Sequence, residues 1–145
     1  MSTTIRPELS EKNKYWIDRH RYYELKHFCL QYPAWKKAYG VLDGLSKRPN
    51  DNPILAKLNV VSDPTARCAV TKAYLAERIA MIEDVAEDTD EELASYILHG
   101  VTEGCSYDIL RVRYNIPCCK DVYYDLYRRF FWLLSKERED ESQRF

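Results

Sequence analysis

Apolar side chains along this 145-residue chain recur mainly at three- and four-residue steps, the spacing that places them on one face of an α-helix. No run of alternating β-branched and polar residues marks a strand, and the chain holds only four glycines. We therefore predict an all-α fold. At this length, with 46% apolar residues, the chain can bury a hydrophobic core without disulfides or metal ions.

Two aromatic-rich helices are expected near the N-terminus, with a proline between them. The first runs from about Glu11 to Gln31, and the second continues from Pro33 to about Leu45. Pro33 suits the first turn of a helix, where its missing N–H is not needed. Tyr32 should lie outside helical geometry, because a following proline disfavours the helical conformation. Together these helices would form a hairpin.

The stretch "SKRPNDNP" separates this hairpin from the rest of the chain. Turn-forming residues follow one another from Pro49 to Pro53, which is typical of a loop. We expect an aromatic helical hairpin over residues 1–48 and a linker or loop over 49–61. The remaining residues, 62–145, should hold a linker helix followed by a helix-turn-helix.

The linker helix begins at "SDPT", where either of the first two residues can cap it and Pro64 takes its first turn. Further along, "TDEE" matches a capping box, in which Thr89 would open the next helix and pair with Glu92. Gly104 is placed to end that helix, because glycine adopts the left-handed conformation readily.

Two more helices follow, separated by a short break. Ser106 should start the first, "NIP" at 115–117 should end it, and the second should run from about Cys119 to Lys136. The apolar stripe predicted for this last helix consists of Val122, Leu126, Phe130 and Leu133. A second apolar row, Tyr123, Tyr127, Phe131 and Leu134, adjoins it. A short helix, a tight turn and a longer helix with exposed bases are what a helix-turn-helix requires.

Candidate DNA-binding residues follow from this geometry, because the N-terminal part of the second helix faces base edges in the major groove. The residues expected off the apolar stripe and toward the bases are Lys120, Asp121, Tyr124, Asp125 and Arg128. Lys120, Tyr124 and Arg128 lie four residues apart and should face outward on one side. Arg129 and Arg111 should meet phosphates.

Charge and cysteine content narrow the function classes. The net charge of -1 does not itself argue for a nucleic-acid partner, but basic residues predominate over 5–48, and all charged residues in 83–92 are acidic.

The five cysteines are odd in number, and neither Cys-x-x-Cys nor His-x3-His spacing occurs. We expect no disulfide framework, no metal site and no cofactor. No stretch resembles a membrane span or signal peptide, which favours a cytoplasmic protein.

The aromatic residues admit three interpretations: core packing, stacking platforms for single-stranded nucleic acid, or a protein-docking surface. Packing is the default, because most of these residues fall on apolar stripes. Catalysis is not expected. His20, His27 and His99 show no convincing carboxylate partner at helical spacing, and no cysteine has an evident activating base.

The strings "SDPTARCAVTKAYLAERIAMIEDV" and "YILHGVTEGCSYDILRVRYNIPCCKDVYYDLYRRFFWLL" resemble the RinA/ArpU family of phage-encoded transcriptional regulators. The likeness covers about half the chain, residues 62–134, and is sharpest at "SDPTAR". It implies a C-terminal domain similar to region 4 of sigma factors and a DNA-reading role for Lys120, Tyr124 and Arg128. Cys118-Cys119 and the acids Asp121 and Asp125 depart from the usual Ser/Thr/Arg-rich opening of that helix.

The expected function is therefore that of a phage or prophage DNA-binding regulator of late transcription in a bacterial cell. Its partners would be double-stranded DNA and RNA polymerase or another host protein, with self-association left open. A non-enzymatic phage inhibitor or adaptor that docks on a host protein is the main alternative. A small terminase subunit is a further DNA-binding alternative, because it too can present helix-turn-helix units.

Overall fold

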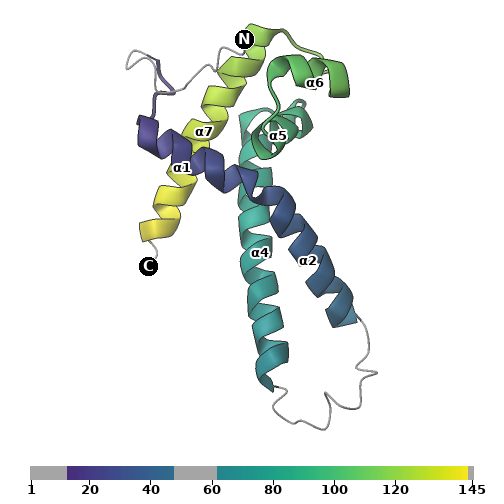
Figure 1. The fold of residues 1–145 in the computed structure, drawn as a ribbon. Helices are drawn as coiled ribbons and strands as arrows, with labels where there is room; N and C mark the ends of the chain where they lie inside the picture. The colour runs from purple at the N-terminus through teal and green to yellow at the C-terminus, as the bar shows by residue number, and fades with distance from the viewer. Residues whose placement is uncertain (1–12, 48–61, 144–145) are drawn as a thin grey trace.

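The computed structural model describes residues 13–47 and 62–143, and every regular element in these two ranges is an α-helix (Figure 1). The helices are α1 (Arg19–Leu30), α2 (Tyr32–Lys47), α4 (Ser62–Thr89), α5 (Ala94–Glu103), α6 (Tyr107–Tyr114) and α7 (Lys120–Gln143). The predicted all-α class is confirmed for the described part of the chain. The linker expected over 49–61 lies outside it.

The helices form a head and a projecting arm (Figure 1). The head contains α1, α5, α6, α7 and the C-terminal half of α4. The arm consists of α2 and the N-terminal half of α4, which lie side by side and run in opposite directions. The predicted hairpin of the first two helices is wrong in this respect, because α2 continues away from α1 and pairs with α4 instead.

The N-terminal helix boundaries differ from the sequence prediction. Helix α1 begins only at Arg19, because Asp18 caps it by accepting a hydrogen bond from His20 N at 3.0 Å. Tyr32 is the first residue of α2 rather than a non-helical residue. Its ring is buried, and its hydroxyl donates to Glu83 Oε2 on α4 at 2.5 Å. This tertiary contact outweighs the local effect of the proline.

The capping box predicted at Thr89 is also wrong. Thr89 is the last residue of α4, and its buried hydroxyl donates back to Val85 O at 2.7 Å. Asp90 instead orders the turn before α5, since its Oδ1 accepts from the backbone N–H groups of Glu92 and Leu93, both at 3.0 Å. The N-cap of α5 is Leu93, which makes no side-chain capping hydrogen bond. The predicted end of the next helix is confirmed, because Gly104 follows α5 with a φ of 70°.

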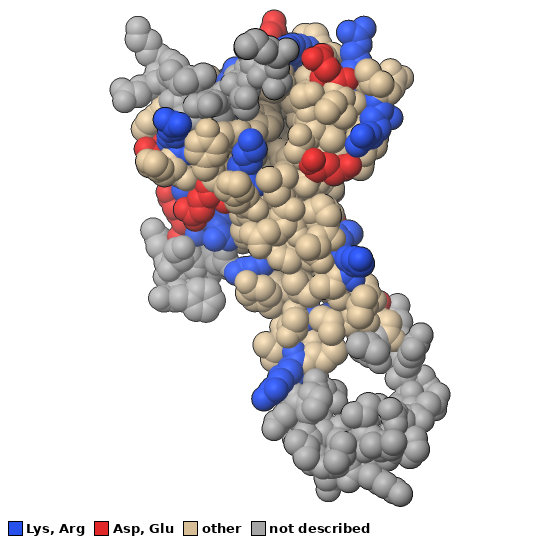
Figure 2. Space-filling view, viewed as in Figure 1, with Lys and Arg blue, Asp and Glu red and all other residues tan. Residues whose placement is uncertain are grey.

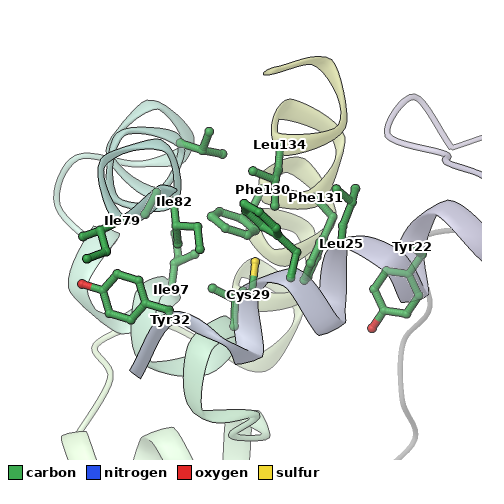
Figure 3. Packing of buried hydrophobic residues seen from close by; sticks show 14 of the residues in the cluster. Tyr22, Leu25, Cys29, Tyr32, Ile79, Ile82, Ile97, Phe130, Phe131 and Leu134 are labelled. Carbon is green, nitrogen blue, oxygen red and sulfur yellow. The ribbon is translucent and has the colours of Figure 1, made fainter. Parts of the chain in front are cut away.

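The main hydrophobic core lies where α1 crosses α4, α5 and α7 (Figure 3). Fully buried residues of this core include Tyr22, Leu25, Cys29, Ile82, Ile97, Phe130, Phe131 and Leu134. Tyr22 packs edge-on against Phe131 with ring centroids 5.2 Å apart, and the hydroxyls of Tyr22 and Tyr127 are hydrogen-bonded at 2.5 Å. Much of the aromatic content is therefore packing, and α1 joins the C-terminal helices through it.

Candidate nucleic-acid interface

A second, smaller cluster joins α6, the turn after it and the start of α7. Its buried members are Tyr107, Leu110, Ile116, Tyr123 and Tyr124. The predicted boundaries of α6 are confirmed at both ends. Ser106 Oγ accepts from Ile109 N at 3.4 Å, and Asn115 ends the helix in the left-handed conformation with φ 54°.

The backbone and the side chain of Tyr107 each donate a hydrogen bond that holds the turn against α7. Its hydroxyl donates to the Cys118 carbonyl oxygen at 2.6 Å. Its backbone N–H donates to the Tyr124 hydroxyl at 3.4 Å. Ile116, in the middle of the turn, is buried in the same cluster. The start of α7 is thus fixed relative to α6 by side chains from both helices and by the turn itself.

The structure separates the predicted DNA-contacting residues into three groups. Those on the surface are Arg111, Lys120, Asp121 and Asp125, and those half-buried are Arg128 and Arg129. Tyr124 is buried, with 8% of its surface exposed, so the expectation that it faces outward with Lys120 and Arg128 is wrong. Its ring packs into the α6–α7 cluster and its hydroxyl accepts the Tyr107 N–H. Tyr124 therefore positions α7 rather than reading a ligand.

The apolar stripe of α7 is rotated from the one predicted. Leu126 and Phe130 are buried as expected, but Val122 is 46% exposed and Leu133 is only partly buried. The adjoining second row lies deeper in the core, since Tyr123, Phe131 and Leu134 are almost inaccessible and Tyr127 is half-buried. Packing against α6 on one side and α1 on the other draws this second row inward. Val122 is consequently available on the first turns of α7.

The surface of α6 and the start of α7 carries both signs of charge. Figure 2 shows Lys and Arg side chains beside Asp and Glu at the end of the head where Figure 1 places α6. On α6, Arg111 and Arg113 are exposed, and so is Asp108. The surface is therefore not uniformly basic, and selective contacts rather than bulk attraction would have to supply much of any DNA recognition.

A cluster that the sequence prediction missed joins α5 to the end of α6. The His99 ring stacks on Tyr114 with centroids 4.0 Å apart, and its Nδ1 contacts Glu103 Oε2. The Tyr114 hydroxyl donates to Glu103 Oε1 at 2.9 Å. His99 thus has a carboxylate partner four residues along its helix, contrary to expectation. The spacing was visible in the sequence, but the contribution of Tyr114 from another helix was not.

The cysteines near this unit pack as apolar side chains. Cys105 and Cys118 both contact the α6–α7 cluster, and burial raises the pKa of each thiol. Both thiols are therefore protonated near neutral pH. All five cysteines are free.

Among the described residues, no group of three or more His, Cys, Asp or Glu side chains is arranged to hold a metal ion. Over the same residues, no helix is both long and apolar enough to cross a membrane. No family model, curated protein or solved structure matches this chain.

Proposed function

We propose that the protein binds double-stranded DNA through α6, the following turn and the start of α7, and acts as a phage- or prophage-type regulator of late transcription. The observation that carries the proposal is the fixed start of α7. Its first turns expose Lys120, Asp121 and Asp125, while Tyr124 and the Tyr107–Cys118 hydrogen bond hold them in place. A rigid helix with exposed polar side chains at its N-terminal end suits the major groove.

Each exposed side chain has a distinct role in this proposal. Lys120 can donate to guanine, and the carboxylates of Asp121 and Asp125 can accept from the amino group of cytosine. Arg111 on α6 and the half-buried Arg129 would contact phosphates, and Arg128 would reach either a base or a phosphate. The acids oppose non-specific attraction to the backbone, so we expect modest affinity for random duplexes and a marked preference for particular sequences.

The role in transcription rests on the resemblance of residues 62–134 to the RinA/ArpU regulators. RNA polymerase or another host protein would be the second partner. The outer face of α6 supports a protein contact, because Val112 is 88% exposed and Ile109 43% exposed. The same observation favours the second candidate function, an adaptor or inhibitor that docks on a host protein through α6 without binding DNA.

A fluorescence-anisotropy titration with a pool of random duplexes at low salt separates these functions. We expect the wild-type protein to bind, and Arg111→Ala, Lys120→Ala and Arg128→Ala each to weaken binding without lowering the melting temperature. Lys37→Ala, at an exposed position on α2, is the matched control and should leave binding unchanged. If the triple variant binds like the wild type, or the wild type binds no duplex, the DNA-binding function is wrong and docking through α6 is favoured.

A further inference from the structure

One face of α4 in the arm is exposed and partly apolar. Arg67, Val70, Tyr74, Glu77 and Met81 follow one another at three- and four-residue steps and so lie along one side of the helix. Val70 is 69% exposed and Tyr74 is 50% exposed. The two side chains lie on adjacent turns and form one exposed apolar patch, and such patches can mark a contact site.

Helix α7 lies beside this face in the head but not in the arm. Higher on α4, Met81 and Val85 line a groove of about 380 Å³ together with Glu137 of α7. In Figure 1, α7 accompanies only the half of α4 that lies in the head, whereas α2 accompanies the half in the arm. Helix α2 packs on a different side of α4, where Asp43 bonds to Lys72. Val70 and Tyr74 therefore lie on the same side of α4 as Met81 and Val85, in the part of the helix that α7 does not accompany.

The charges on this face are arranged symmetrically about position 72. Arg67 and Glu77 lie at equal distances on either side of that position, and so do Val70 and Tyr74. Both Arg67 and Glu77 are exposed, and neither forms an ion pair with another described residue. One end of the face is thus basic and the other end is acidic. Its centre holds Val70 and the Tyr74 ring, one side of which is covered by the Arg78 guanidinium at 3.8 Å.

We propose that a second copy of the chain covers this face, with the two α4 helices antiparallel and related by a two-fold axis near position 72. In that arrangement Val70 packs on the partner's Tyr74, and Arg67 meets the partner's Glu77, each contact occurring twice. A parallel arrangement would instead place Arg67 against Arg67. The face is complementary to its own inverted copy, which is why a second copy fits it better than an unrelated apolar helix.

The groove beyond Glu77 adds to the complementarity. Asp84, Asp88 and Glu137 line it besides Glu77, so the end of the face that receives the partner's Arg67 is strongly acidic. The antiparallel order also directs the two heads to opposite ends of the paired arms. Each α6–α7 unit stays uncovered, so self-association is independent of whether that unit binds DNA.

Sedimentation velocity of the full chain over a concentration series tests the interface. The wild type should self-associate to a dimer. Arg67→Glu alone and Glu77→Arg alone should each weaken dimerisation at least about tenfold, because like charges then meet at both symmetric contacts. The double variant Arg67→Glu/Glu77→Arg should recover it, since the pairs are restored with reversed signs. An equimolar mixture of the two single variants should form a heterodimer for the same reason.

Lys37→Glu, a charge reversal at an exposed position on α2, serves as the control and should dimerise like the wild type. Helical circular dichroism and melting temperature confirm that each variant folds. A wild type that stays monomeric at the highest soluble concentration overturns the proposal. So does a dimer that both single charge reversals leave unchanged, or one that neither the double variant nor the mixture restores.

Discussion

The Tyr123 hydroxyl of α7 lies directly against the backbone of Gly100 in α5. A Cβ atom added at Gly100 would meet Tyr123 Oη at 2.0 Å and Leu110 Cδ1 at 3.3 Å. Gly100 is therefore the point at which α5 approaches both α6 and α7. An interior glycine costs a helix about 1 kcal/mol relative to alanine, and here the close approach of three helices accounts for it.

Gly100→Ala should destabilise the protein by about 1 to 3 kcal/mol, the usual cost of overpacking, because Tyr123 is 1% exposed and has no space to move into. Urea denaturation measures the change. Gly40→Ala is the matched control, since nothing lies within 4 Å of a Cβ at that helical position. It should stabilise the protein by about 0.5 to 1 kcal/mol. Equal effects of the two substitutions would contradict the close contact.

Tyr123→Phe should leave stability unchanged or raise it. The hydroxyl is buried and has no hydrogen-bond partner among the described residues, and burial raises the pKa of Tyr123. Removing it eliminates a desolvated polar group. The same substitution should offset part of the Gly100→Ala cost, with a coupling of about 0.5 to 3 kcal/mol in a double-mutant cycle. Strictly additive changes in the free energy of unfolding would show that Gly100 and Tyr123 are not in direct contact.

Tyr107→Phe should loosen the turn between α6 and α7 without unfolding the core. The substitution removes the 2.6 Å hydrogen bond to the Cys118 carbonyl, at a cost of about 0.5 to 1.5 kcal/mol. Hydrogen exchange should accelerate at residues 116–120 and stay unchanged in α1. Tyr96→Phe is the control, because its side chain packs on the same cluster but donates no hydrogen bond to a described residue. Unaltered exchange in the Tyr107 variant would contradict the role given to this bond.

The contact of α5 with the end of α6 should weaken in acid. Burial alone raises the pKa of Glu103, but hydrogen bonds from His99 and Tyr114 outweigh it and lower the pKa below the usual 4.5. A carboxyl group with a lowered pKa stabilises the fold above its unfolded-state pKa, and this stabilisation is lost as pH falls through the folded-state value. The melting temperature of the wild type should therefore fall below about pH 4.5 more steeply than that of Glu103→Gln. Parallel curves would contradict this linkage.

Local chemistry explains which helix boundaries could be predicted from the sequence. The helix ends at Gly104, Ser106 and Asn115 depend on the backbone or side chain of the residue itself and on neighbours within a few positions. Such boundaries can be recognised in the sequence without knowledge of the tertiary structure. Thr89 fits two local patterns equally well, because its hydroxyl can cap a following helix or bond back to its own. The burial of Thr89 against the core selects the second.

The orientation of α7 could not be predicted, because its sequence has two overlapping apolar rows. Either Val122 or Tyr123 could have faced inward, and only the positions of α1, α5 and α6 decide between them. Among the candidate site residues, this rotation changes the role of Tyr124 and leaves Lys120 and Asp125 on the surface. The pairing of α2 with α4 was hidden for a similar reason, since an apolar helix face does not identify its partner.

The salt dependence of duplex binding tests the proposed DNA interface most directly. For the wild type, the logarithm of the association constant plotted against the logarithm of salt concentration should fall with a slope of about −2 to −4, as expected for two to four phosphate contacts. Arg111→Ala and Arg129→Ala should each reduce the slope by about one, whereas Lys37→Ala should not change it. Absence of binding at the lowest salt, or a slope that the Arg111→Ala/Arg129→Ala variant leaves unchanged, would contradict DNA binding by α6 and α7.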